Sequence, residues 1–328
     1  MFNSPLWGDA VTLFLSLVIQ AMPFLLLGIG VSGILSVWVD ERWLLGWLPK
    51  SPWLAALVGG MLGFLFPVCE CGNIPVARRL LIKGVPLPVG IAFLLAAPVF
   101  NPVVLIATWV AFPQQPEMVA YRALLSLGIA VLVGWLFRWH PQPQSLFQPG
   151  ILPSPSPTSL LQGGTFWVGS PSPLTALAVY QRALVEQERQ NRSQGQRWLL
   201  LLQTWSKEIT ELGAVLILGA AIATAVQVLM PRQWLQTSGQ DSVISVLVML
   251  ALAAIVSICA SVDAFFALAF ASTFTQGSLL AFLVFGPMID LKAIGLMLTI
   301  FRPPAIFALI ALTLQLTFTS CLLINIFA

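Results

Sequence analysis

Residues 69–75 read CECGNIP, and residues 259–263 read CASVD. After each stretch comes an apolar run that ends in a proline with a polar residue three positions later, in Pro98-Val99-Phe100-Asn101 and in Pro287-Met288-Ile289-Asp290. Proline lacks a backbone N–H and disfavours helical structure in the residue before it. The chain therefore contains two apolar segments that are interrupted at matching places.

The two halves of the chain correspond residue by residue around these interruptions. Cys69 corresponds to Cys259, Cys71 to Ser261, Asn73 to Asp263, and Asn101 to Asp290. Interrupted apolar segments at corresponding positions of two halves are typical of transporter binding sites, because unwound backbone inside a membrane needs protein or water partners. Four spans per half predict parallel repeats, and a re-entrant segment in each half predicts inverted ones.

The composition indicates that lipid is the solvent. Of the 328 residues, 58% are hydrophobic and 8% are charged, whereas about a quarter of the residues of an ordinary soluble domain are charged. The net charge of +3 is small, so the sequence shows no nucleic-acid-binding surface. We predict an all-α polytopic membrane protein with about eight transmembrane helices in two four-helix repeats, with a broken helix at each repeat motif.

Apolar runs and a change in composition divide the chain into three parts. The first membrane repeat covers residues 1–137, with helices near 10–38, 53–68, 88–112 and 119–137; the second covers 207–328, with helices near 212–230, 242–258, 277–300 and 303–327. Between them, residues 138–206 are rich in Pro, Ser, Gln and Gly, which predicts a mobile linker. We expect helix breaks at Pro98, Pro102 and Pro287.

The distribution of basic residues predicts the orientation. With eight spans, both termini, the linker, and the connection that carries Arg78, Arg79 and Lys83 share one side of the membrane. That side has about twice as many basic residues as the other, so the positive-inside rule places it in the cytoplasm. We therefore predict a protein of the inner or plasma membrane with both termini and the central linker in the cytoplasm.

Three cysteines form a candidate metal site. Cys69 and Cys71 are separated by one residue, and Cys259 occupies the corresponding position in the second half. Thiolates are soft ligands that suit trivalent arsenic, copper(I) or zinc. The alternative is that these cysteines are small residues packed where helices cross, as buried cysteines commonly are. Cys321 lies in the last apolar run with no second cysteine, histidine or acid there, and we predict that it only packs.

Two acids and two amides are the other candidates for a solute or ion pathway. Asp263 and Asp290 are the only acids in residues 243–328, and an acid within a membrane span is a functional hypothesis because its burial is costly. Each acid is a candidate carrier of a coupling proton or a substrate cation. The alternative is a helix cap or an ion pair with Lys292 or Arg302. We predict that Asn101 and Asp290 face each other near the midplane, with Asn73 and Asp263 lining the same path.

Several of these motifs together resemble a known family. They are Cys69-Glu70-Cys71-Gly72 with Pro75, LLAAP at 94–98 leading to Asn101-Pro102, DAF at 263–265, and Gly286-Pro287-Met288-Ile289-Asp290-Leu291-Lys292. Together they resemble the predicted permeases of the ArsP/YraQ type, over nearly the whole membrane portion but not the linker. The resemblance implies an eight-helix inner-membrane permease, and some relatives export trivalent organoarsenicals.

The sequence favours a permease that moves a small solute, with efflux of a soft metal or a trivalent organoarsenical as the candidate activity. One alternative is a membrane subunit that handles a metal ion with a soluble partner, since there is no Walker motif. The other is an intramembrane aspartyl enzyme, but Asp290 does not lie between glycines and no hydrolase motif is present. We predict no enzyme and no cofactor. The expected partners are the lipid bilayer and the solute, with a second copy or a soluble protein left open.

Overall fold

A computed structural model describes residues 5–38, 48–49, 51–65, 70–139, 146–148, 194–229, 242–256, 260–268, 270–271 and 273–327. Within these ranges the regular elements are helices, apart from an isolated antiparallel bridge between Phe147 and Phe301. Four stretches there are long and apolar enough to cross a membrane, namely Ala10–Gly33, Glu117–Trp139, Gln276–Met297 and Pro303–Ile326. The all-α polytopic prediction is confirmed.

The first half contains α1 (Pro5–Trp38), α3 (Pro52–Leu65), α4 (Glu70–Ile82), α5 (Leu87–Ala96), α6 (Pro102–Ala111), α7 (Glu117–Leu136) and the short 3-10 helix η1 (Phe137–Trp139). The expected break between α5 and α6 is present, and Pro102 begins α6, where its missing N–H costs nothing. The sequence predicted only a connection between spans at α4, because it carries Arg78, Arg79 and Lys83. In the structure every residue from Glu70 to Ala77 is buried, because α4 packs against α1, α5 and α13.

The second half contains α9 (Gln194–Leu229), α10 (Ser242–Ile255), α11 (Ala260–Leu268), α12 (Gln276–Met288), α13 (Leu291–Met297) and α14 (Pro303–Phe327). Helix α9 begins at Gln194, before the linker boundary that the composition indicated. Pro287 lies inside the last turn of α12. The helical path is interrupted just after it, at Ile289 and Asp290, so a broken helix is present in each half.

Helices α5 and α12 form the centre of the protein. Every residue of α5 is buried, and so is every residue of α12 from Gly277 onward. Helix α5 packs against α3, α4 and α7, while α12 packs against α10, α11 and α14. The halves also meet along two interfaces between short helices, which we name the α4–α13 seam and the α6–α11 seam.

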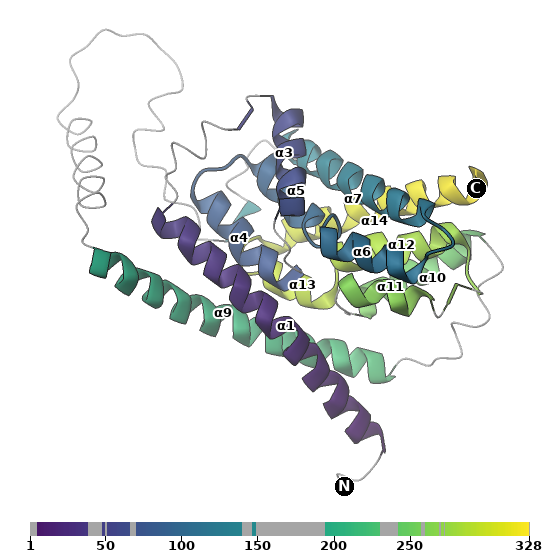
Figure 1. Ribbon diagram of the computed structural model, residues 1–328, viewed down its shortest axis with the longest axis horizontal. Helices are drawn as coiled ribbons and strands as arrows, with labels where there is room; N and C mark the ends of the chain where they lie inside the picture. Colours follow the sequence, from purple (N-terminus) through teal and green to yellow (C-terminus); the bar gives the residue numbers. More distant parts are fainter. Residues whose placement is uncertain are drawn as a thin grey trace.

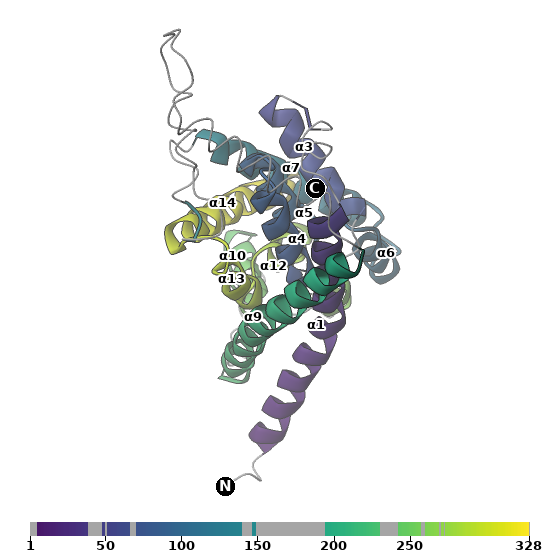
Figure 2. The ribbon, with the colours of Figure 1, turned by 90° about the vertical axis from the view of Figure 1, so that its left-hand side faces the viewer.

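Two pairs of long helices connect the halves, and the two helices of each pair run in opposite directions. Helices α1 and α9 pack together, as do α7 and α14. In Figure 1, α1 runs from the N-terminus at the lower right toward the upper left, while α9 runs from left to right; Figure 2 shows the same opposition. Helix α7 likewise runs toward the end at which α14 begins.

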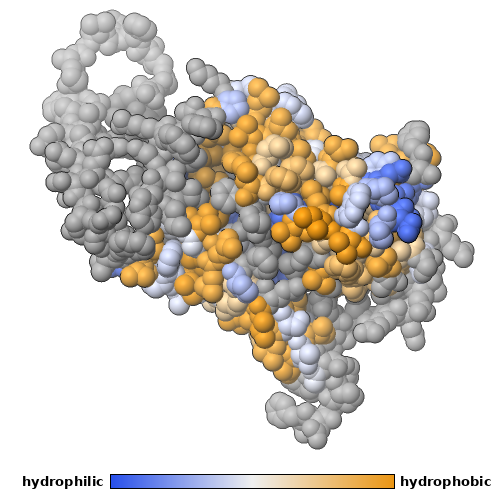
Figure 3. All heavy atoms as spheres, viewed as in Figure 1, coloured by the Kyte–Doolittle hydropathy of each residue, from blue (hydrophilic) through white to orange (hydrophobic). Residues whose placement is uncertain are grey.

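The surface matches a lipid environment. Many large apolar side chains are exposed, among them Leu65, Trp109, Leu124 and Phe307. Apolar residues cover most of the described surface in Figure 3, and the hydrophilic ones gather mainly at its right-hand end. Exposed apolar surface of this extent is stable in hydrocarbon rather than in water.

Two glycines bring α1 and α4 into backbone contact. A Cβ atom on Gly28 would collide with the carbonyl oxygen of Gly72, whereas a Cβ on Gly30 meets nothing within 4 Å. Close approach through small residues is a common way for membrane helices to associate. Gly28 is therefore required by packing, and Gly30 is not.

This contrast predicts different effects of two alanine substitutions on α1. Gly28→Ala should lower the free energy of unfolding by about 1–3 kcal/mol, because the added methyl group overpacks the crossing. Gly30→Ala is the matched control and should leave stability unchanged or slightly raised, since alanine is the better helix former. Thermal unfolding in detergent measures both, and equal midpoints would contradict the packing described here.

Candidate functional site

The α4–α13 seam holds a buried cluster of three charged side chains. The Nζ atom of Lys292 lies 3.5 Å from Oε1 of Glu70 and 3.7 Å from Oδ2 of Asp290. All three side chains are at most 4% exposed. Glu70 belongs to α4 in the first half, and Lys292 and Asp290 belong to the second half. The ammonium group therefore joins the two halves across the seam.

Asp290 also caps a helix. Its Oδ1 atom accepts a hydrogen bond of 2.6 Å from the backbone N–H of Ala293, at the start of α13. Such a cap satisfies one of the backbone donors that a helix leaves free at its N-terminus. Asp290 thus has both roles that the sequence offered as alternatives to carrying a proton or a cation. It caps a helix, and it pairs with Lys292.

Asn101 has the corresponding place in the first half. It is buried and caps α6, where its Oδ1 atom accepts a 3.0 Å hydrogen bond from the N–H of Val103. Asn73 is also buried, and its Nδ2 donates to the carbonyl oxygen of Leu94 on α5 at 2.8 Å. No hydrogen-bond partner for Oδ1 of Asn73 occurs in the described part of the chain. Asn101 and Asp290 thus each cap the helix that follows the break in their own half.

Arg122 of α7 lies at the α6–α11 seam and is completely buried. Its Nη1 donates to Oγ1 of Thr108 on α6 at 2.8 Å, and its Nη2 lies 3.4 Å from the carbonyl oxygen of Ala260 on α11. Asp263, also on α11, is buried as well. Arg122 therefore ties the first half to the second.

Arg122 is not among the site residues that the sequence predicts. The available signal was its place three residues inside the apolar run that begins at Val119. A charge at such a place usually has a buried partner. That partner comes from residues far away in sequence, so the run alone does not identify it.

The two seams follow one rule. At each, a buried cation of one half is held by a polar group of the other half: Lys292 lies 3.5 Å from Glu70, and Arg122 lies 3.4 Å from the carbonyl oxygen of Ala260. Removing such groups from water costs several kcal/mol per ion, and the attraction offsets this only while the partners stay together. Separating the halves at either seam is therefore expensive.

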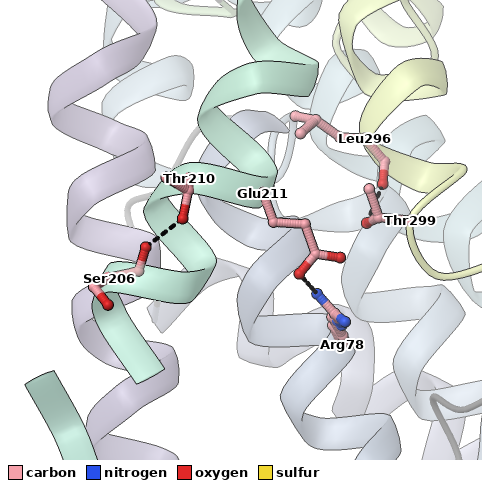
Figure 4. A network of polar contacts seen from close by, with 6 residues as sticks. All are labelled: Arg78, Ser206, Thr210, Glu211, Leu296 and Thr299. Atoms are coloured by element: carbon pink, nitrogen blue, oxygen red, sulfur yellow. Dashed lines mark hydrogen bonds and ion pairs between the residues drawn. The ribbon is translucent and has the colours of Figure 1, made fainter. Parts of the chain in front are cut away.

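A third charged contact lies nearer the surface. Arg78 of α4 meets Glu211 of α9 at 3.3 Å (Figure 4), with side chains 19% and 39% exposed. In the same view, Thr210 donates to the carbonyl oxygen of Ser206, and Thr299 to that of Leu296. Partly exposed pairs contribute little to stability, so this contact orients α4 against α9 more than it stabilises the fold.

The predicted thiol site is only partly described. Cys71 is a free, buried cysteine on α4, and Cys321 is a free, buried cysteine on α14. Cys69 and Cys259 lie outside the described residues. Among the described residues, no group of three His, Cys, Asp or Glu side chains is placed to hold a metal ion. The metal site stays a prediction.

Buried polar caps and charged contacts thus lie between two helical halves of a protein with an apolar surface. A family described as a predicted permease matches residues 6–326. The chain belongs to this permease family. The resemblance seen in the motifs is thereby confirmed, and the protein is a multi-pass membrane permease.

Two relatives of this permease match over nearly their whole lengths. It is 36% identical to the UPF0718 protein YcgR of Bacillus subtilis strain 168, over 96% of each chain. It is 28% identical to a protein of Streptococcus mutans serotype c named putative two-component membrane permease complex subunit, over 97% of this chain and 95% of that one. No solved structure matches the chain.

The permease should depend on Lys292 for stability. Lys292→Met leaves the carboxylates of Glu70 and Asp290 buried without this ammonium, which should lower the free energy of unfolding by about 3–5 kcal/mol. The double variant Glu70→Gln with Lys292→Met should recover much of that loss. Arg302→Met removes an exposed cation nearby and is the control. Denaturant unfolding in detergent measures all four proteins, and equal losses in the single and double variants would contradict the pairing.

Proposed function

We propose that this permease moves a small solute between its two halves, along a path lined by Asn73, Asn101, Asp263 and Asp290. The observation that carries the proposal is the pair of broken helices, α5–α6 and α12–α13, whose breaks are capped by the buried polar side chains of Asn101 and Asp290. Irregular backbone at membrane depth is tolerated where it lines a cavity or is held by protein. Family membership supports transport over the aspartyl enzyme.

The halves are best explained as inverted repeats. Both contain a long helix, two short helices, a broken helix and a final long helix, in the same order. The corresponding helices α1 and α9 run in opposite directions, and so do α7 and α14 (Figures 1 and 2). Parallel repeats would place corresponding helices in the same direction. Inverted halves with a site at their interface are common among transporters.

Inverted halves require an odd number of crossings in each half. Helix α1, the broken helix α5–α6 and α7 supply three. Helices α3 and α4 have 14 and 13 residues, so each reaches only about 20 Å and is too short to cross about 30 Å of hydrocarbon. We propose that α3 and α4 enter and leave on the same side, as α10 and α11 do in the second half.

This arrangement sharpens the charge asymmetry. The linker side then carries Arg42, Lys50, Arg78, Arg79, Lys83, Arg138, Arg182, Arg189, Arg192, Arg197, Lys207 and Arg302, and the side of the termini carries Arg232. Arg122 and Lys292 are buried within the protein. By the positive-inside rule the linker lies in the cytoplasm. Both termini then lie outside, in contrast to the expectation from eight spans.

A reporter enzyme distinguishes the two topologies. Alkaline phosphatase fused after Ala328 should be active, since it folds only outside the cytoplasm, and the same enzyme inserted at residues 162–164 should be inactive. A green fluorescent protein at the same two places should give the reverse pattern and is the control. Inactive phosphatase at both places would support eight spans with parallel halves and would overturn the inverted arrangement.

The cargo proposal rests on the thiols. We propose efflux of a soft metal or a trivalent organoarsenical, with Cys69, Cys71 and Cys259 as ligands. A second subunit is proposed as well, because one relative is named a subunit of a two-component permease complex. The basic linker, on the cytoplasmic side, is a suitable docking site for it.

Replacing the thiols tests the cargo. In a metalloid-sensitive host, Cys69→Ser and Cys71→Ser should each abolish the resistance that the unsubstituted permease gives, while Cys321→Ser should retain it, because Cys321 lies in α14 away from the motif. Growth and cellular accumulation are compared for organoarsenicals, arsenite, zinc and copper. Full resistance in the double serine variant, with normal membrane levels, would reduce these thiols to packing.

A further inference from the structure

A cavity of about 510 Å³ opens beside the α6–α11 seam. Its walls come from the end of α6 and the following residues 112–115, from Leu268 and Ala271, and from Phe274, Gln276 and Leu279 around the start of α12. This volume is within the range of small-molecule sites, roughly 300–1,000 Å³. Both halves of the permease contribute to it, as expected for a solute site between repeats.

The walls of this cavity carry neither a charge nor a thiol among the residues that the structure shows lining it. They consist of apolar groups, including Phe112, Phe274 and Leu279, together with the amides of Gln114, Gln115 and Gln276. An amide offers a hydrogen-bond donor and an acceptor without a charge. Phe112, Phe274 and Leu279 are buried, whereas Gln114 and Gln115 are exposed at the rim. An ion that moved from the rim to the apolar part of the wall would lose hydration without a charged partner there.

We propose that this cavity is the outer binding site of the permease and that it takes an uncharged, partly apolar solute that bonds to the glutamine amides. The proposal rests on the transport function and the inverted topology proposed above, and it deepens them by naming the class of solute. Of the cargo classes proposed above, these walls do not suit a bare metal cation, so the cavity narrows the proposed cargo to uncharged solutes.

One hydrogen bond places the outer end of the cavity near the C-terminus, and the position of Ala111 places its inner end. Next to Gln276, the backbone N–H of Gly277 donates to Oδ1 of Asn325 near the end of α14, at 2.8 Å. On the inner side, Ala111 in the cavity wall lies one turn beyond Thr108, which accepts a hydrogen bond from Arg122. The cavity therefore lies outside the charged α6–α11 seam, next to the proposed path.

The loop between α13 and α14, which corresponds in the second half to the loop between α6 and α7, is covered by residues 146 and 147. Leu146 and Phe147 are buried there. The carbonyl oxygen of Leu146 accepts from the N–H of Arg302 at 2.8 Å, and the ring of Phe147 stacks on that of Phe301 at 5.4 Å. The loop between α13 and α14 is thus closed over, while the loop between α6 and α7 borders the cavity. The structure is open toward the side of the termini.

Thiol reagents of different charge test the proposal. Gln276→Cys places a thiol in the cavity wall, and Glu117→Cys places one at an exposed position on the same side, outside the wall. Intact cells are treated with neutral methyl methanethiosulfonate, its cationic trimethylammonium-ethyl analogue or its anionic sulfonatoethyl analogue. The unsubstituted protein gives the background from native cysteines. The ratio of neutral to charged reaction rates should be higher at residue 276 than at residue 117 by about tenfold or more, since the apolar wall penalises either charge.

Each outcome supports or overturns a stated part of the proposal. Equal ratios at the two positions would overturn an uncharged solute, and so would rapid reaction of only one charged reagent at residue 276. Labelling of residue 276 only after the cells are permeabilised would overturn the outer location. The rates at which the reagents modify the thiols do not depend on transport. If the ratio at residue 276 is high but the protein transports nothing, the result contradicts the proposed transport function and not the proposed chemistry of the cavity. Equal ratios together with an external C-terminus would contradict only the proposed solute class.

Discussion

Buried charge between the two halves is the constraint on which the rest of the structure depends. Lys292 and Arg122 are buried, so each needs polar partners at close range, and each has one in the opposite half, Glu70 for Lys292 and the carbonyl oxygen of Ala260 for Arg122. Helix α4, which carries Glu70, must therefore pack against α13, and α11, which begins at Ala260, must lie within reach of α7. The small residues at helix crossings, such as Gly28 over Gly72, make this close packing sterically feasible.

The helix breaks follow from the same lack of solvent. At each break the backbone loses helical hydrogen bonds, and lipid offers no replacement. The amide of Asn101 and the carboxylate of Asp290 supply acceptors for the freed N–H groups. Because α5 and α12 are buried up to the breaks, the breaks lie where protein rather than lipid surrounds them. Polar side chains at the breaks stabilise the fold whether or not a solute also meets them.

The sequence predicted what depends on local chemistry. Apolar run lengths indicated a helical membrane protein, and Pro98 and Pro102 indicated the break that separates α5 from α6. It did not predict the burial of α4, since three basic residues near its end looked like a solvated face. Nor did it predict that Lys292 reaches Glu70, or that Arg122 reaches Ala260, because both contacts join residues more than a hundred positions apart. It also left open whether the repeats are parallel or inverted.

The two seams also limit how such a protein moves. Breaking a buried ion pair by removing one partner costs roughly 3–5 kcal/mol, so a seam opens only where water or a solute replaces the lost partner. A cavity lies beside the α6–α11 seam, whereas Phe147 stacks on Phe301 at the loop between α13 and α14. The contacts of Arg122 and those of Lys292 are both formed in this structure. A change of access between the two ends therefore requires that one seam open while the contacts of the other hold the halves together.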